Sequence, residues 1–293
     1  MLRVGVRGAA AGAEAAAPGE PRPASAKSLL TTILGEFVLP TDGGVWTSTA
    51  VTALDALGFT ERNARQALAR LGDDGLIEPQ RHGRSVRWLL TDTGRALLTT
   101  GAERIYSFGA RAEAWDGHWL VVMCSIPESQ RAKRHQLRSR LTFEGFGFVA
   151  PSVAVCPHRE REGVANDILR SLDLDGEALT LDARTGELTS DTQMIASAWS
   201  LDTLVDDYRA FLAEFSGPAD GAVAAPADAF RDTIRLVDAW RAFPFSDPEL
   251  PVRLLPDDWP GTPARELFAA RRAEWAPAAR DWYLAVETAA RPS

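Results

Sequence analysis

The sequence predicts an α+β protein built from several domains, and length and periodicity support this. At 293 residues the chain is about twice the length of a typical domain, so it has room for two or three. Helical periodicity dominates both ends, whereas the middle alternates between short apolar strands and amphipathic helices. We expect a disordered leader over residues 1–26, a first domain over 27–100, a linker over 101–114, a central domain over 115–200 and a helical domain over 201–293.

Composition excludes several classes of protein. The chain is 45% hydrophobic and 25% charged, as in ordinary soluble domains, and no uncharged apolar run approaches the roughly 18 residues of a membrane span. Two cysteines, Cys124 and Cys156, are too few for a disulfide framework, which is typical of the cytoplasm. A net charge of −8 argues against coating nucleic acid over the whole surface, but it is compatible with one basic module.

The first 26 residues are set apart by composition. They are mostly Ala, Gly and Pro, and charged residues interrupt the apolar stretch that a secretory signal requires. Such a segment buries too little apolar surface to fold, so we expect disorder.

The first domain begins with three helical segments. Ser28–Val38 and Thr47–Leu57 carry apolar residues at helical spacing, and Gly58 ends the second segment. Thr60 is a good N-cap for a third helix, because its hydroxyl can accept from an amide of the first turn.

The third helix has two unlike faces. At about 100° per residue, Ala64, Ala67, Leu68 and Leu71 share one side. The other side, with Asn63 in the first turn and small Ala69 among the long side chains, carries Arg62, Arg65, Gln66 and Arg70. Arginine can donate twice to guanine and glutamine can pair with adenine in the major groove. A solvated helix face would show the same pattern.

A basic hairpin is predicted directly after this helix. Gly75–Ile77 and Val86–Leu90 have strand character, and between them lies the tight turn Arg81-His82-Gly83-Arg84. From residue 60 to residue 95 there are seven arginines and five acids, a local charge of +2. A helix of this kind followed by a basic hairpin is typical of a winged helix-turn-helix. We expect DNA contacts from the helix and from Arg81, His82, Arg84 and Arg87 of the hairpin; the alternative is a purely structural winged domain.

From this point the sequence resembles a known family, the PaaX-type bacterial transcriptional repressors of phenylacetate and related aromatic-acid catabolism. The resemblance covers roughly residues 27–290 in three ordered blocks. After the winged segment, the central block comprises Trp115-Asp116-Gly117, Trp119, Ser125-Ile126-Pro127-Glu128, Arg131, Arg134, Leu137-Arg138 and Gly145-Phe146-Gly147. The terminal block comprises Asp247-Pro248, Leu250-Pro251, Leu254-Leu255-Pro256 and Trp259-Pro260-Gly261. One departure is Pro151–His158, where Ser152 and Val153-Ala154-Val155 stand in place of the family's frequent Gly and aromatic.

The central segment, taken by itself, predicts a small α+β domain. The expected order is strand, helix, strand, helix, strand, over Trp119–Ile126, Ser129–Phe143, Phe146–Val155, Val164–Leu172 and Ala178–Asp182. This order is typical of a ferredoxin-like sheet. The resemblance implies the same fold, which nucleases of bacterial adaptive immunity share.

The last third predicts amphipathic helices over Leu201–Phe215, Ala229–Phe243, Leu267–Trp275 and Asp281–Thr288. The resemblance implies a homodimer and an effector, typically a coenzyme A thioester of an aromatic acid. Such a ligand needs an apolar slot and cations for its phosphates. Candidate residues are Trp199, Tyr208, Arg209, Trp240, Arg241 and Phe243. Aromatic residues at helical spacing are more often simply core.

Catalytic patterns are missing from the sequence. We find no nucleophile elbow, phosphate-binding loop or zinc-protease motif, and the four histidines lack metal-ligand spacing. A metal-dependent nuclease of this fold needs an acid at the end of its first strand, but here Cys124-Ser125-Ile126-Pro127 precedes Glu128. The basic run from Arg131 to Arg140 could hold DNA or an anionic ligand, or be a solvated face. We expect Cys156, near His158, to be a structural thiol.

These observations predict a ligand-responsive repressor that binds an inverted-repeat DNA operator as a homodimer, with no metal, cofactor or membrane partner. Two alternatives remain open: a metal-dependent nuclease or other enzyme of the ferredoxin-like fold, and a protein-interaction module whose winged domain does not bind DNA.

Overall fold

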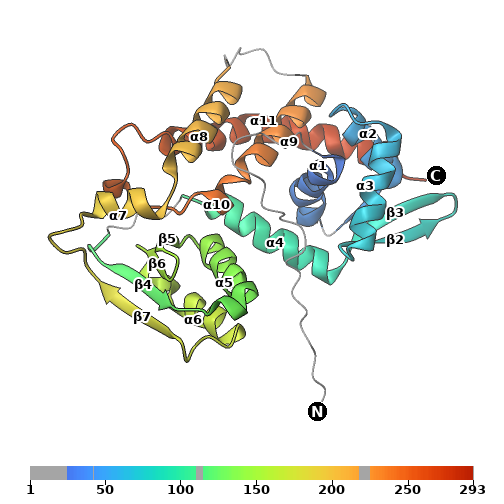
Figure 1. The fold of residues 1–293 in the computed structure, drawn as a ribbon. Helices are drawn as coiled ribbons and strands as arrows, with labels where there is room; N and C mark the ends of the chain where they lie inside the picture. The colour runs from blue at the N-terminus through green and yellow to red at the C-terminus, as the bar shows by residue number, and fades with distance from the viewer. Residues whose placement is uncertain (1–24, 42, 110–114, 218–224, 293) are drawn as a thin grey trace.

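The computed structural model describes residues 25–41, 43–109, 115–217 and 225–292. It is a mixed α/β protein with two small antiparallel sheets and a helical C-terminal region, as the sequence predicts. Figure 1 shows the three-stranded sheet at one end of the molecule and the four-stranded sheet at the other. The expected leader lies outside the described residues, except for Ser25 and Ala26, which are the N-cap and first residue of α1.

The N-terminal part contains helices α1 to α4 and the first sheet. Its elements are α1 (Ala26–Ile33), the π-helical turn η1 (Leu34–Val38), η2 (Leu39–Thr41), β1 (Gly44–Trp46), α2 (Thr47–Asp55), α3 (Glu61–Asp73), β2 (Ile77–His82), β3 (Ser85–Leu90) and α4 (Asp92–Ser107). The strand order is β1-β3-β2, with both pairs antiparallel. The short β1 adds a third strand to the predicted hairpin.

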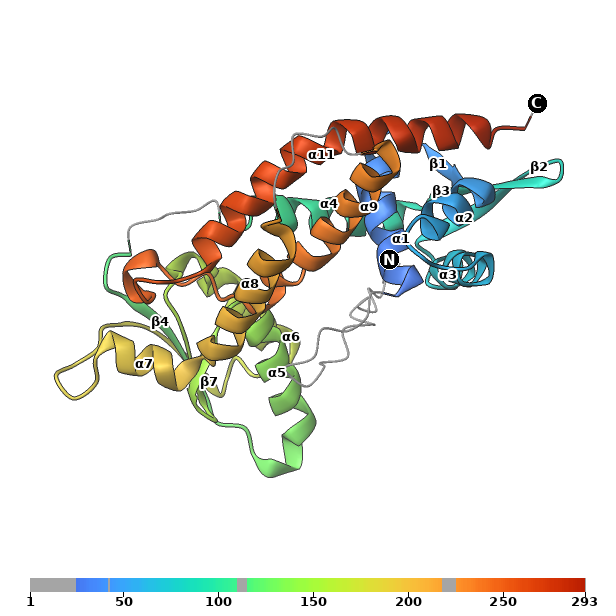
Figure 2. The same ribbon diagram turned by 90° about the horizontal axis from the view of Figure 1, so that it is seen from above.

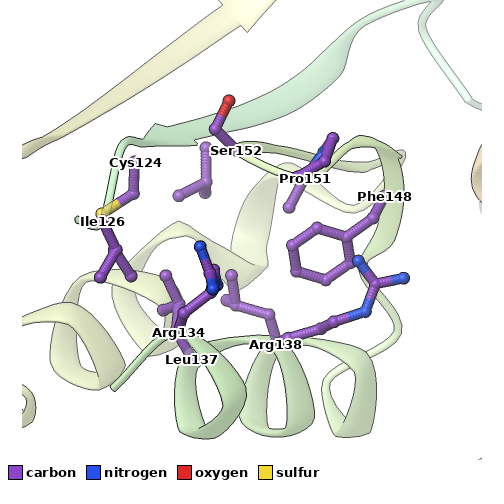
Figure 3. A pocket seen from close by; sticks show the side chains of 11 residues that line it. Cys124, Ile126, Arg134, Leu137, Arg138, Phe148, Pro151 and Ser152 are labelled. Atoms are coloured by element: carbon purple, nitrogen blue, oxygen red, sulfur yellow. The ribbon is translucent and has the colours of Figure 1, made fainter. Parts of the chain in front are cut away.

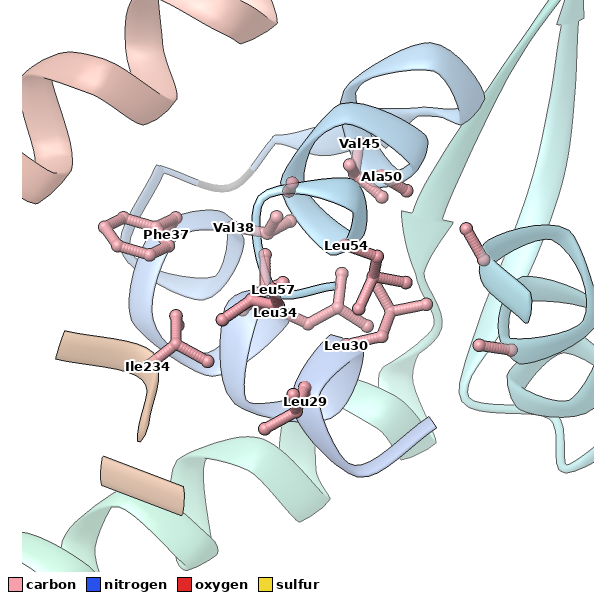
Figure 4. Close-up of a cluster of buried hydrophobic side chains, with 14 of the residues drawn as sticks. Leu29, Leu30, Leu34, Phe37, Val38, Val45, Ala50, Leu54, Leu57 and Ile234 are labelled. Carbon is pink, nitrogen blue, oxygen red and sulfur yellow. The ribbon is translucent and has the colours of Figure 1, made fainter. Parts of the chain in front are cut away.

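The core under α3 is completed by residues from the far end of the chain. Leucines of α1, α2 and α3 pack together with Phe230 and Ile234 of α9 (Pro226–Trp240) and with Ala279 and Tyr283 of α11 (Gly261–Ala289). Figure 4 shows Ile234 beside Phe37 and the leucines of α1. The predicted division between residues 27–100 and 201–293 therefore does not separate the hydrophobic cores, because this one core draws on both.

Helix α4 crosses the predicted boundary between residues 100 and 101. Residues 101–107 of the expected linker are helical, and residues 110–114 lie outside the described part of the chain. Thr91 caps α4 by accepting from the Gly94 amide at 3.0 Å. A Cβ on Gly94 would collide with the carbonyl of Leu76, so glycine lets α4 lie close against the start of β2.

The central part is a four-stranded antiparallel sheet covered by helices. Its elements are β4 (Trp119–Cys124), η3 (Glu128–Gln130), α5 (Arg131–Phe143), β5 (Gly147–Ala150), β6 (Val153–Cys156), η4 (Arg159–Arg161), α6 (Glu162–Ser171), β7 (Ala178–Ala183) and α7 (Asp191–Ala198). The order is β5-β6-β4-β7. The single strand predicted over residues 146–155 is wrong: Pro151 and Ser152 form a turn that makes it the hairpin β5–β6, because proline lacks the amide that a continuous ladder needs.

The C-terminal part contains α8 (Leu201–Phe215), α9, α10 (Phe243–Ser246), η5 (Val252–Leu254) and α11. The two last helices predicted from the sequence are one helix of 29 residues that continues through Pro277. Phe268 anchors its first half in a second core with α8 and α9, and Tyr283 anchors its second half in the first core. We attribute the continuity across Pro277 to these two anchors. Figure 2 shows α11 running from α8 to the end of the molecule that carries β1 and α2.

Candidate nucleic-acid interface

Helix α3 is fixed at its start by a capping box. The Thr60 hydroxyl oxygen accepts from the Asn63 amide at 3.3 Å, and Asn63 Oδ1 accepts from the Thr60 amide at 3.3 Å. Both residues thus satisfy amides that the helix leaves unpaired. The sequence predicts a DNA contact for Asn63, whereas the structure shows its side-chain oxygen in the helix cap.

The inner face of α3 is buried and its outer face is exposed, as the periodicity predicts. Ala64, Ala67, Leu68 and Leu71 are at most 2% exposed. The exposed residues on the outer face are Arg62, Arg65, Gln66, Ala69 and Arg70. The buried leucines and alanines fix the rotation of the helix, so its arginine face points away from the core.

One arginine of this face is held by a neighbour. Arg65 donates from Nε and Nη2 to Glu61 Oε1, both at 2.7 Å. The side chains of Arg62 and Arg70 form no ion pair or hydrogen bond with other described residues. The side chains of Glu61, Arg62, Arg65 and Gln66 surround an open hollow that also includes Ala69.

The hairpin β2–β3 lies beside α3 at the same end of the molecule (Figure 1). Gly83 has φ +60° in its turn, a conformation that favours glycine. The predicted turn residues Arg81, His82 and Arg84 are exposed. The His82 ring approaches the Trp46 ring edge-on at 5.1 Å between centroids, which braces the hairpin against β1.

Arg87 differs from the other predicted hairpin contacts. It pairs in register with Trp46 of β1, and its guanidinium carbon lies 5.7 Å from the centroid of the Trp46 ring. Its Nε is buried without a hydrogen-bond partner among the described residues. Arg87 also favours the ionised forms of Tyr283 and Glu287 on α11. Its electrostatic partners lie inside the protein, in contrast to the exposed tip of the hairpin.

Glu287 brings a buried carboxyl group from α11 to the start of α2. It is 7% exposed, and neither oxygen has a hydrogen bond of good geometry with a described residue. Burial raises the pKa of Glu287, while Thr49, the Trp46 amide and Arg87 oppose the rise. The last turns of α11 are therefore joined electrostatically to α2 and β3.

Three of the six candidate effector residues are packed core. Tyr208 stacks on Phe243 with centroids 4.1 Å apart, and Trp240 lies 5.3 Å from Phe243. The Tyr208 hydroxyl donates to Asp247 at 2.6 Å. These rings are at most 4% exposed and occupy the space that an aromatic ligand would need.

The other three candidates are scattered. Trp199 packs in a separate core and touches the space above Gly147, where a Cβ would collide with its ring. Arg209 is exposed on α8, and Arg241 donates to Ser28 of α1 at 2.9 Å. The structure does not bring the six residues together around one cavity.

A small pocket lies between the central sheet and α5 (Figure 3). Its volume, about 10 Å³, is room for little more than one water molecule. Arg138 covers the Phe148 ring, with 4.4 Å between its guanidinium carbon and the ring centroid. Arg134 pairs with Glu128, the acid that follows the first strand of the central sheet. Arg134 and Arg138 of the predicted basic run line this pocket, and both already form contacts within the chain.

The described residues contain no group of three or more His, Cys, Asp or Glu placed to hold a metal ion. Burial raises the pKa of Cys156 to about 12, so its thiol is protonated at neutral pH. His158 Nε2 lies 2.8 Å from the Glu249 carbonyl oxygen. No described helix is both long enough and apolar enough to span a bilayer.

Comparison with known proteins identifies the family. The chain is 30% identical to the transcriptional repressor PaaX of Escherichia coli (strain K12) over 270 residues, which is 88% of this chain and 82% of that protein. The chain belongs to the PaaX family. Three PaaX family models match in succession: "PaaX-like protein" over residues 25–94, "PaaX protein central Cas2-like domain" over 112–195 and "PaaX-like protein C-terminal domain" over 199–285.

A solved structure supports the fold of this PaaX family member. The uncharacterized protein Rv0674 from Mycobacterium tuberculosis superposes with a TM-score of 0.62 at 21% identity. The match covers 89% of this chain and the whole of that chain. The arrangement of all three parts, and not only the individual domains, therefore recurs in another protein.

Proposed function

We propose that the chain is a transcriptional repressor that binds double-stranded DNA through α3 and the β2–β3 hairpin, as a winged helix-turn-helix. The observation that carries the proposal is the exposed strip of Arg62, Arg65, Gln66 and Arg70, on a helix whose opposite face is locked into a core. Family membership and the E. coli repressor support it.

The two basic surfaces have different roles in this proposal. Arg and Gln side chains of α3 recognise base edges in the major groove, because their donors and acceptors match guanine and adenine. Arg81 and Arg84 at the hairpin tip bind phosphates, which adds salt-dependent affinity without sequence preference. Arg87 and Asn63 are left out of the contact set, since one faces α11 and the other caps α3.

The domain organisation follows from the cores. The DNA-binding module comprises residues from α1 to α4 together with parts of α9 and α11. The central domain has the connectivity β4-α5-β5-β6-α6-β7 and the order β5-β6-β4-β7, which is typical of a ferredoxin-like fold.

Dimerisation and effector response complete the proposal. A homodimer would place two α3 helices about one helical turn apart on an inverted repeat. An aromatic acyl-CoA, the effector class that the family implies, would release DNA by favouring a different subunit arrangement. Such coupling is typically on the order of 1–3 kcal/mol. A site for this effector would have to open between packed elements, since Tyr208, Trp240 and Phe243 are buried against one another.

The test is DNA binding by a charge-reversal variant. Arg65→Glu/Arg70→Glu should lose binding to the promoter upstream of its own operon in a gel shift. Arg170→Glu, an equally exposed arginine on α6 with a side chain 63% accessible, is the matched control and should bind normally. Unchanged binding by the double variant would overturn the assignment to α3. Addition of phenylacetyl-CoA, with free coenzyme A as control, tests the effector class in the same assay.

A further inference from the structure

The hollow on the outer face of α3 has a methyl group among long polar side chains. Ala69 is exposed and lies four residues after Arg65 and three after Gln66, so the three share one face of the helix. The hollow is lined by Glu61, Arg62, Arg65, Gln66 and Ala69. Alanine has the shortest side chain of these residues, so a ligand in the hollow can reach its methyl group between the longer polar side chains.

We infer that Ala69 recognises the C5-methyl of a thymine, and that Arg65 recognises a guanine within about two base pairs of it. The inference rests on the proposed function, and it assigns individual bases that the proposed function does not assign. Thymine carries the apolar group that a base pair offers in the major groove, and alanine is an established partner for it. A longer side chain at position 69 would keep the helix from approaching so closely.

The Glu61–Arg65 pair explains why Arg65 is assigned to guanine. Glu61 accepts from Nε and Nη2 of Arg65 at 2.7 Å, so the guanidinium is oriented before DNA arrives, while its remaining donors stay free. Arg65 and Ala69 are four residues apart, about 6 Å along the helix axis, or roughly two base-pair steps. This spacing sets the expected distance between guanine and thymine.

The test uses the full-length chain and DNA that differs by one methyl group. A high-affinity duplex is first selected from a random library, and each thymine is then replaced singly by deoxyuridine. At one half-site position the replacement should weaken wild-type binding about fourfold, the factor expected from about 0.8 kcal/mol for one buried methyl. Ala69→Gly and Ala69→Ser should bind the two duplexes with nearly equal affinity. The ratio is measured within each variant, so a loss of stability does not affect it.

The outcomes separate the inference from the proposed function. Two results would show that the methyl assignment is wrong while the proposed function stands. One is that wild type binds the selected duplex but no single replacement of thymine by deoxyuridine changes its affinity by more than about 1.5-fold. The other is that Ala69→Gly keeps the fourfold ratio. If no sequence is enriched over random DNA, the proposed function fails and the inference with it. Arg65→Ala should bind without a preference for guanine, and it should still bind the deoxyuridine duplex more weakly than the thymine duplex. If Arg65→Ala keeps the preference for guanine, the assignment of Arg65 is wrong.

Discussion

Tyr283 of α11 stacks on Phe37 of the first helical segment, with ring centroids 4.7 Å apart and planes 14° from parallel. The two residues are separated by most of the chain, yet both belong to the core beneath α3. The last helix is therefore a structural part of the proposed DNA-binding module, and any movement of α11 acts on the support of α3.

Removing the Tyr283 ring should destabilise the protein strongly. Tyr283 is 3% exposed, so Tyr283→Ala should lower the free energy of unfolding by about 3 kcal/mol, measured by urea denaturation. Tyr283→Phe should be close to neutral, because the hydroxyl has no hydrogen-bond partner among the described residues. Leu284→Ala, exposed on the same helix, is the control and should change stability by about 0.5 kcal/mol or less. Equal effects at positions 283 and 284 would contradict the shared core.

Asn63 should act on stability and not on base recognition. Asn63→Ala removes the capping oxygen and should cost about 1 kcal/mol. Asn63→Asp keeps that oxygen and adds a negative charge at the helix N-terminus, so it should be at least as stable as wild type. Melting temperatures and operator affinity should be measured together. A stable Asn63→Asp protein that no longer prefers its operator would show that Asn63 recognises a base after all.

Glu287 should make stability depend on pH. Its pKa is raised in the folded state, so the unfolded chain loses this proton first as pH rises above about 4.5. The contribution of Glu287 is complete below that pH and is lost as pH rises through the folded pKa. Glu287→Gln stays neutral, so its stability relative to wild type should increase over this range in urea titrations. Glu266→Gln, exposed on the same helix, is the control. A stability of Glu287→Gln relative to wild type that falls as pH rises would instead indicate a carboxylate that Arg87 stabilises in the folded state.

The sequence predicts most local features of the candidate interface and few of its long-range contacts. The faces of α3 follow from helical spacing, and the hairpin follows from Gly83 and its flanking strand residues. Helix α7 is absent from the sequence prediction, although the capping pair Ser190 and Gln193 indicates its start. Periodicity cannot indicate which core an apolar stripe joins, so Ile234 looked like part of a separate helical domain.

Arg87 shows the same limit for charged residues. Along the hairpin it resembles Arg81 and Arg84, and only the pairing of β3 with β1 brings it beside Trp46. Tyr208 and Trp240 show the same limit for aromatic residues, because the sequence does not indicate that both rings are buried. In each case the sequence gives the chemistry of a side chain, whereas its surroundings depend on distant strands and helices.

The salt dependence of DNA binding should separate Arg87 from the other arginines. Each phosphate contact releases counterions, so losing one lowers the slope of log affinity against log salt by about 1. Arg81→Ala and Arg84→Ala should each show this decrease and keep wild-type stability, because both side chains are exposed. Arg87→Ala should keep the slope, and it should lower stability because it removes the guanidinium that packs over the Trp46 ring. Affinity measured from low to moderate salt, with urea denaturation of each variant, tests both statements. A reduced slope for Arg87→Ala at unchanged stability would place Arg87 on the DNA and separate it functionally from α11.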